Sequence, residues 1–138
     1  MNIIISRVNE LDFQKVELLA KQLELDWEDA SCGQFLVAKE DESIVGFGRV
    51  RAYPNCSEIA TVGVIKEKQN KGIGLLLMKA LINISPNEVF VTCVIPNFFK
   101  QLGFIHTKQY PPILQKKVDF CKSYNFCDNQ VFVMQLKK

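Results

Sequence analysis

This sequence has no long hydrophobic run, no paired cysteine motif and no large surplus of charge of either sign. No apolar stretch approaches the roughly 20 residues that a membrane-spanning helix needs. The apolar start of the chain lacks the basic region and the small-residue cleavage site of a signal peptide. A formal net charge of +2 gives no support for nucleic acid or a membrane surface as a partner. We therefore expect a cytoplasmic protein with no nucleic-acid or membrane partner.

Cysteine and histidine are too scattered for a metal centre or a disulfide framework. The five cysteines include no Cys-x-x-Cys pair, and the spacing of Cys121 and Cys127 is too loose for a zinc knuckle. The single histidine, His106, is remote from them in the sequence. A chain of 138 residues can bury a core without metals or disulfides. We predict reduced cysteines, no metal and one domain over residues 1–138.

The hydrophobic pattern alternates between the periods of strands and helices. β-branched and aromatic residues predict strands over 2–8, 34–39, 44–51, 57–67, 88–95, 104–109 and 130–136. Apolar residues at helical spacing predict a helix that begins near Asn9 or Asp12, a second over 72–84 and a short third over 97–102. This order is typical of an α/β domain with a mixed sheet.

Two glycines, Gly72 and Gly74, lie where a strand gives way to a strongly amphipathic helix. The first N–H groups of a helix have no partner within it, and with the helix dipole they form an anion site. A P-loop is excluded because Leu75 and Leu76 follow the second glycine, and a Rossmann fingerprint is excluded because its third glycine is Leu77. A tight turn without a ligand is the alternative interpretation of a lone Gly-x-Gly.

The run Gln69-Asn70-Lys71-Gly72-Ile73-Gly74, here called the glycine loop, resembles the [RQ]-x-x-G-x-[GA] motif of the GNAT superfamily of acetyl-CoA-dependent N-acetyltransferases. The segments "FLVAKEDESIVGFGRV" and "FFKQLGF" (Phe98–Phe104) resemble two further parts of that family, so the likeness covers nearly the whole chain. It implies an α/β fold: a mixed, mostly antiparallel central sheet with a splayed pair of strands, flanked by helices. It also implies acetyl-CoA as the acetyl donor.

The resemblance implies a set of donor-binding residues. Backbone N–H groups of the glycine loop would hold the pyrophosphate of coenzyme A, and the end of the preceding strand would pair with the pantetheine arm. An N–H of that strand, at Val64 or its neighbour, would polarise the acetyl carbonyl. The implied donor-binding residues are Val62, Gly63, Val64, Gln69, Asn70, Lys71, Gly72, Ile73, Gly74, Leu75 and Asn97.

Two positions bear on proton transfer. An amine with a pKa near about 10 must lose a proton before it attacks, and Glu58 lies where members of the family often carry a glutamate base. A strand-end carboxylate that binds a substrate cation, or has no role, is the alternative. Phe99 stands where the family usually has the tyrosine that protonates the departing thiolate. Tyr110, Tyr124, a cysteine or water could replace it, or the thiolate could leave unaided.

Three residues are candidates for binding the acceptor. Arg49 and Arg51 alternate with Val50 on a strand that faces the acceptor cleft in the family. Arginine binds carboxylates bidentately, although solvated strand residues are the alternative interpretation. Trp27 lies in the region that shapes the acceptor site in the family.

The C-terminal third faintly resembles the short amino-acid N-acetyltransferases related to N-acetylglutamate synthase, through Lys117-Val118, Cys121 and Cys127. This favours an amino acid as the acceptor. We thus predict an N-acetyltransferase that acts on a primary amine of a small molecule, with an amino acid as one candidate. The alternatives are a protein or peptide N-acetyltransferase and an acyl-CoA-binding regulatory module without catalysis. Either a monomer or a homodimer fits the sequence.

Overall fold

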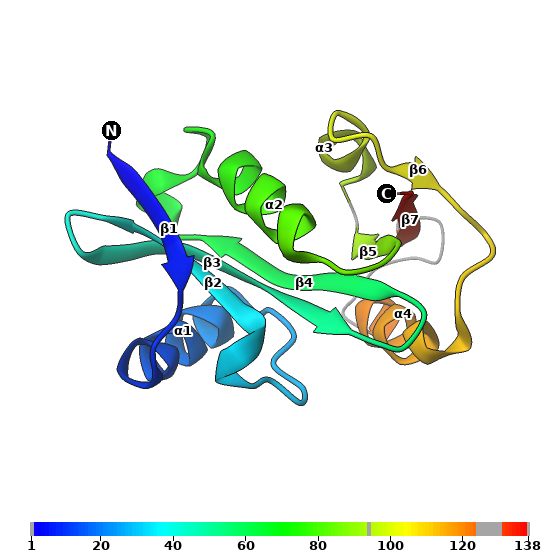
Figure 1. Ribbon diagram of the computed structural model, residues 1–138, viewed down its shortest axis with the longest axis horizontal. Coiled ribbons are helices and arrows are strands. Elements are labelled where there is room, and N and C mark those ends of the chain that lie inside the picture. The colour runs from blue at the N-terminus through cyan, green and yellow to red at the C-terminus, as the bar shows by residue number, and fades with distance from the viewer. Residues whose placement is uncertain (1, 94, 124–130, 138) are drawn as a thin grey trace. The chain divides into compact units, whose positions relative to one another are not determined.

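The computed structural model describes residues 2–93, 95–123 and 131–137 (Figure 1). The candidate proton donor Tyr124 and the cysteine Cys127 lie outside these residues. Within them, no helix is both long and apolar enough to cross a bilayer. The chain divides into two compact units, one of Met1–Arg51 with Ile59–Ile84 and one of Ala52–Glu58 with Ser85–Lys138. The prediction of one domain over the whole chain is not tested by this division.

Strands and helices alternate much as the sequence predicts. The strands are β1 (Ile3–Arg7), β2 (Phe35–Glu40), β3 (Ser43–Ala52), β4 (Ser57–Val64), β5 (Val89–Cys93), β6 (Ile105–His106) and β7 (Phe132–Leu136). The α-helices are α1 (Glu10–Gln22), α2 (Ile73–Ile84), α3 (Pro96–Lys100) and α4 (Gln115–Ser123). Within the described residues, 3₁₀ turns occupy Cys32–Gln34, Lys66–Lys68 and Pro112–Leu114.

The described strands form a sheet in the order β1-β2-β3-β4-β5-β7-β6. β1 with β2, β2 with β3, β5 with β7, and β6 with β7 are antiparallel. β4 and β5 are parallel, and their described register comprises Ser57 with Val89 and Glu58 with Phe90. The prediction of a mixed, mostly antiparallel sheet flanked by helices is therefore confirmed.

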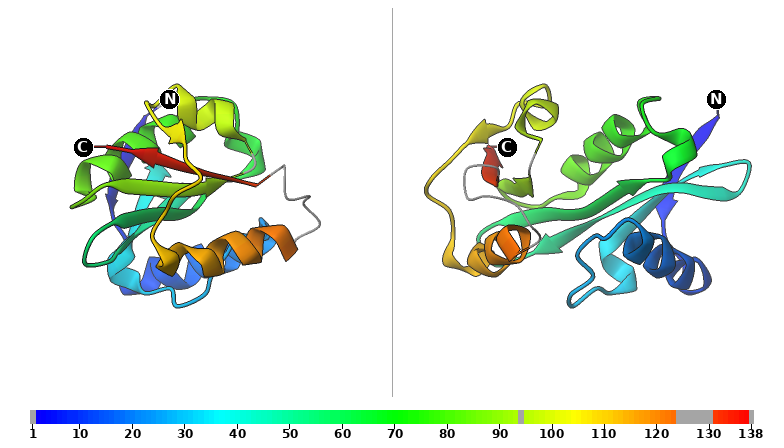
Figure 2. Two further views of the ribbon diagram at one scale, coloured as in Figure 1. Left: turned by 90° about the vertical axis from the view of Figure 1, so that its right-hand side faces the viewer. Right: turned by 180° about the vertical axis from the view of Figure 1, so that it is seen from behind.

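In the first unit, α1 and α2 cover opposite faces of the strands (Figures 1 and 2). α1 begins at an Asn9 cap, whose side-chain oxygen accepts a hydrogen bond of 2.8 Å from the Asp12 N–H. Its buried residues Val16 and Ala20 pack with Phe35, Val37 and Phe47. This packing closes the α1 side of the sheet.

Two glycines of β3 let α2 approach the other face. A Cβ on Gly46 would lie 2.8 Å from Leu77 Cδ1, and a Cβ on Gly48 would lie 2.6 Å from Leu81 Cδ1. Both distances are shorter than ordinary van der Waals contact, so the leucine side chains of α2 would have to shift to admit a side chain at either position. Leu77 and Leu81 are both fully buried.

In the second unit, a helix that the sequence analysis missed packs on β5 and β7. The first residue of α4 follows the Pro112–Leu114 turn, and Leu114 and Val118 pack with Phe90 and Val133. The predicted strand 104–109 is shorter in the structure, since only Ile105–His106 pairs with β7. Burial raises the pKa of Cys93 in β5 to about 11, despite a hydrogen bond with the Ile95 backbone that lowers it.

Asp12 links α1 to β2 and makes the first unit sensitive to acid. Asp12 is 7% exposed, and its Oδ2 lies 2.7 Å from Lys39 Nζ. The hydrogen bond from Lys39 lowers the Asp12 pKa from its ordinary value of 3.8. Because the folded-state pKa is the lower one, this stabilisation is present above about pH 4 and is lost as the pH falls through the folded value.

We expect Asp12→Asn to flatten the acid response of stability. The melting temperature of the variant should fall less than that of the wild type between about pH 5 and pH 3, because asparagine takes up no proton. Thermal unfolding followed by circular dichroism at several pH values measures this. Parallel curves for the two proteins would contradict the assignment.

Candidate active site

The glycine loop leads from the end of β4 into α2 in the first unit. Asn70 and Gly72 both have left-handed backbones, with φ of 64° and 87°. Nothing lies within 4 Å of the position that a Cβ on Gly72 would occupy. The Leu76 N–H donates to the Gly72 carbonyl, which leaves the N–H groups before it, at the first turn of α2, outside the helical ladder. The loop therefore offers a run of amides at an open helix start, which suits a phosphate group.

Gln69 fixes this loop to the strand before it. Its side-chain Nε2 donates a hydrogen bond of 2.9 Å to the Val64 carbonyl oxygen, the last of β4. Three lysines lie near the glycine loop in the sequence. Lys66 and Lys71 are exposed, whereas Lys68 forms an ion pair of 2.6 Å with Glu40. The hydrogen bond from Lys68 lowers the pKa of Glu40. Two of the three basic side chains around the loop thus extend into solvent.

The predicted pantetheine strand is packed tightly on the α1 side. A Cβ on Gly63 would lie 2.9 Å from Leu23 Cδ1, from Leu25 Cδ1 and from Phe47 Cζ. Val62 and Val64 are half-buried. The glycine in "VGV" therefore lets the α1 side of the unit pack directly against the strand backbone.

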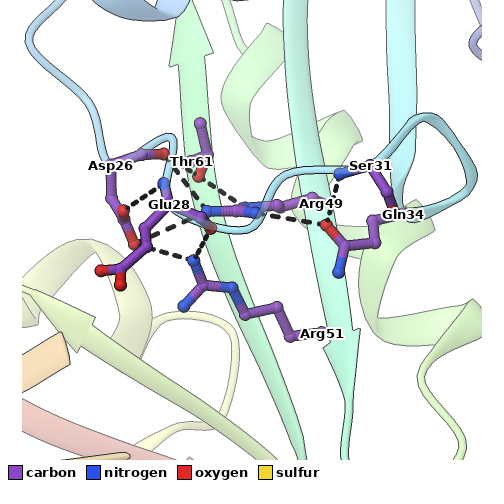
Figure 3. Close-up of polar contacts among 7 residues, drawn as sticks. All are labelled: Asp26, Glu28, Ser31, Gln34, Arg49, Arg51 and Thr61. Carbon is purple, nitrogen blue, oxygen red and sulfur yellow. Dashed lines mark hydrogen bonds and ion pairs between the residues drawn. The ribbon is translucent and has the colours of Figure 1, made fainter. Parts of the chain in front are cut away.

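Arg49 and Arg51, the predicted carboxylate-binding pair, both bind Asp26 (Figure 3). Arg49 NH2 lies 3.6 Å from Asp26 Oδ2, and Arg51 NH2 lies 3.1 Å from the same oxygen. The side chain of Arg49 is 0% exposed and that of Arg51 is 14% exposed. Arg51 also donates to the Glu28 carbonyl. Any ligand carboxylate would therefore reach Arg51 before Arg49.

Arg49 is held on several sides. Its Nε donates to Thr61 Oγ1 at 2.8 Å, and its NH1 donates to Gln34 Oε1 at 3.2 Å. Thr61 Oγ1 in turn donates to the Asp26 carbonyl at 2.6 Å (Figure 3). We call Asp26, Arg49 and Thr61 the buried brace. It joins β3 and β4 to the segment that follows α1.

Trp27 follows the brace aspartate and belongs to an aromatic cluster. Its ring centroid lies 5.3 Å from that of Phe13 and 5.1 Å from that of Phe35. The residue is half-buried, so part of its ring is accessible. Trp27, a predicted acceptor-binding residue, is thus adjacent in sequence to Asp26, whose carboxylate binds the other two, Arg49 and Arg51.

The second unit carries the remaining predicted residues. Glu58 is 1% exposed, in the part of β4 that pairs with β5, and Asn97 is exposed in the first turn of α3. Phe99, at the usual tyrosine position, contacts Phe98 and Phe104 edge-on, with centroids 5.0 and 5.8 Å apart. The hydroxyl of Tyr110, an alternative proton donor, donates to Gln115 Oε1 at 2.9 Å.

Asp26, Gln34 and Thr61 carry no signal in the sequence that predicts a place in the site. Asp26 lies in an acidic segment that reads as exposed, and it is 5% exposed in the structure. Thr61 was expected on a regular strand, but its φ is 53°. A β-branched residue gives no sequence signal for a left-handed backbone, because such residues avoid it.

Comparison with known proteins places this geometry in a family. The model of the acetyltransferase (GNAT) family matches residues 5–104. An uncharacterised N-acetyltransferase of Chlorobaculum tepidum is 30% identical over 109 residues, which are 74% of this chain and 70% of that protein.

Two solved structures have a similar fold at low identity. N-acetylglutamate synthase from Neisseria gonorrhoeae, complexed with coenzyme A and N-acetyl-glutamate, has a TM-score of 0.80 at 17% identity. That match covers 99% of this chain, which spans 35% of the synthase chain. Naa50 of Arabidopsis thaliana, in complex with the bisubstrate analogue CoA-Ac-MVNAL, has a TM-score of 0.70 at 16% identity and covers 100% of both chains. The chain belongs to the acetyltransferase (GNAT) family, which confirms the prediction of an acetyl-CoA-dependent N-acetyltransferase.

Proposed function

We propose that this enzyme moves the acetyl group of acetyl-CoA to the primary amine of a small molecule, with an amino acid as the favoured acceptor class. The observation that supports the donor site is the open start of α2, which follows the left-handed residues Asn70 and Gly72. There the amides of residues 69–75 bind the pyrophosphate, and Lys71 adds positive charge. The end of β4, at Val62, Gly63 and Val64, pairs with the pantetheine arm.

The transfer needs a neutral amine and a stabilised oxyanion. The amine nitrogen attacks the acetyl carbonyl carbon, and a backbone N–H at Val64 or its neighbour stabilises the oxygen that gains charge. The attacking nitrogen gives up its extra proton to water, and collapse of this intermediate breaks the carbon–sulfur bond, giving a neutral amide and the coenzyme A thiolate. With Phe99 at the usual tyrosine position, water supplies the proton that this thiolate takes up.

Arginine supports an acceptor with a carboxylate. Arg51 is the more exposed of the two candidate side chains, and it shares Asp26 with Arg49. The Arg51 guanidinium, at the edge of this cluster, can bind a substrate carboxylate bidentately. The fold likeness to N-acetylglutamate synthase supports the same acceptor class.

An amine panel tests the proposal. Release of coenzyme A thiol from acetyl-CoA would be followed with free amino acids, their amides, polyamines and short peptides. Turnover of amino acids above that of their amides supports a carboxylate-bearing acceptor. Turnover of peptides alone would favour the second candidate, a peptide N-acetyltransferase, which the likeness to Naa50 supports. Coenzyme A binding without turnover of any amine would leave only a binding module.

Glu58 is the proposed general base. Replacing it with glutamine keeps its size but removes its ability to accept a proton from the amine. We expect Glu58→Gln to lower kcat/KM at pH 7 by roughly 100-fold. The loss should shrink as the pH rises toward the amine pKa, because more of the free amine is then already neutral. A pH–rate profile parallel to that of the wild type would remove Glu58 from this role, and coenzyme A affinity serves as the control for folding.

A further inference from the structure

Thr61 has an unusual backbone for a strand residue. It lies within β4 with φ of 53° and is 4% exposed. β-branched residues rarely adopt this left-handed region, so the surrounding structure must hold Thr61 there. It is also the residue directly before Val62, where the proposed donor-binding backbone begins.

The hydrogen bonds between β3 and β4 explain this conformation. The Ile65 N–H donates to the Val45 carbonyl, and the Tyr53 N–H donates to the Cys56 carbonyl. Between these two bonds the segment that contains β3 advances by eight residues, from 45 to 53, whereas the segment that contains β4 advances by nine, from 56 to 65. β4 therefore holds one extra residue, which is a β-bulge. The left-handed Thr61 marks its place.

The other two residues of the buried brace, Arg49 and Asp26, bind the Thr61 side chain at the bulge. Thr61 Oγ1 accepts from Arg49 Nε at 2.8 Å and donates to the Asp26 carbonyl at 2.6 Å. The Arg49 side chain is wholly buried, and its NH2 also donates to the Asp26 carbonyl at 3.3 Å. The Thr61 hydroxyl thus has a hydrogen-bond donor, Arg49 Nε, and an acceptor, the Asp26 carbonyl oxygen.

We propose that the buried brace fixes the position of the bulge at Thr61, and that Asp26, Arg49 and Thr61 are therefore positioning residues for acetyl transfer. A bulge that moved by one residue would turn the N–H and C=O groups that follow it to the opposite side of the strand. The amides of Val62, Gly63 and Val64 would then point away from the donor arm. This inference rests on the proposed function of these three residues.

A matched pair of variants isolates the hydroxyl. Thr61→Val keeps the shape and the β-branch but removes both hydrogen bonds, whereas Thr61→Ser keeps the hydroxyl. We expect Thr61→Val to lower kcat by about tenfold or more and to raise the KM for acetyl-CoA by a smaller factor, because the amides of Val62, Gly63 and Val64 move while the glycine loop is untouched. Thr61→Ser should keep kcat within about threefold of the wild type. A general loss of stability would not produce this split.

Amide chemical shifts provide a second readout that needs no turnover. In the ¹H–¹⁵N spectrum, the Val62, Gly63 and Val64 signals should move far in Thr61→Val and little in Thr61→Ser. Wild-type kcat in Thr61→Val, equal losses in both variants, or unmoved amides would overturn the brace as a positioning device. If the wild type acetylates no amine, the proposed function fails, and the amide shifts alone still decide whether the hydroxyl fixes the bulge.

Discussion

Gly72→Ala is expected to raise the KM for acetyl-CoA by about tenfold, through about 1–2 kcal/mol of backbone strain and through crowding of the amides that we propose bind the pyrophosphate. The φ of Gly72 is 87°, a conformation that alanine adopts only with strain. No atom lies within 4 Å of the added Cβ, so the effect is not a clash inside the protein. Titration of coenzyme A by calorimetry, together with steady-state kinetics, measures it.

Gly33→Ala is the matched control for this substitution. A Cβ at Gly33 also meets nothing within 4 Å, and its φ is not in the left-handed region. The two variants therefore differ in backbone conformation and in location, not in local crowding. We expect Gly33→Ala to bind coenzyme A as the wild type does. Equal affinities for both variants would show that the Gly72 conformation plays no part in donor binding.

Asp26→Asn is expected to destabilise the protein by about 3 kcal/mol, the size of effect seen when one partner of a buried ion pair is removed. The carboxylate is 5% exposed and contacts two guanidinium groups. Its Oδ1 also accepts a hydrogen bond of 2.9 Å from the Glu28 N–H. Asparagine keeps the shape of the side chain but brings no negative charge to Arg49 and Arg51. Urea unfolding at neutral pH measures the difference.

A surface ion pair on α1 is the control for this loss. Glu17 and Lys21 are 2.8 Å apart with side chains 39% and 62% exposed. Exposed helical pairs contribute about 0.3–0.5 kcal/mol, so Glu17→Gln should leave the unfolding midpoint almost unchanged. Similar midpoints for Asp26→Asn and the wild type would mean that the buried carboxylate is no more important than an exposed one.

The local elements could be predicted because their signals are local. The amphipathic pattern of residues 72–84 and the β-branched runs each carry their own periodicity, and α2 and the strands follow them. α4 was missed because Pro111 and Pro112 suggested a break and because its only buried apolar residue with a described side chain is Val118. A helix that owes its stability to packing on β5 cannot be found from its own sequence.

The candidate site was predicted only in part, for the same reason. The glycine loop is a contiguous motif, so its place at the start of α2 follows from the sequence. The buried brace joins residues 26, 49 and 61, which share no spacing rule and meet only once the strands pair. Its aspartate lies in an acidic segment, and its threonine has a backbone that its type disfavours. Tertiary contacts determine both the burial of the aspartate and the backbone conformation of the threonine.

The thiols of this protein bear on how it tolerates oxidants. Burial raises the pKa of Cys32 and of Cys56, and it raises the pKa of Cys93 to about 11. Oxidants and aromatic disulfides react with thiolates, and at neutral pH these three sulfur atoms are protonated. The coenzyme A released at each turnover is a free, solvent-accessible thiol with no such protection. A disulfide dye added to the native enzyme should therefore react with the product well before it reaches these three cysteines.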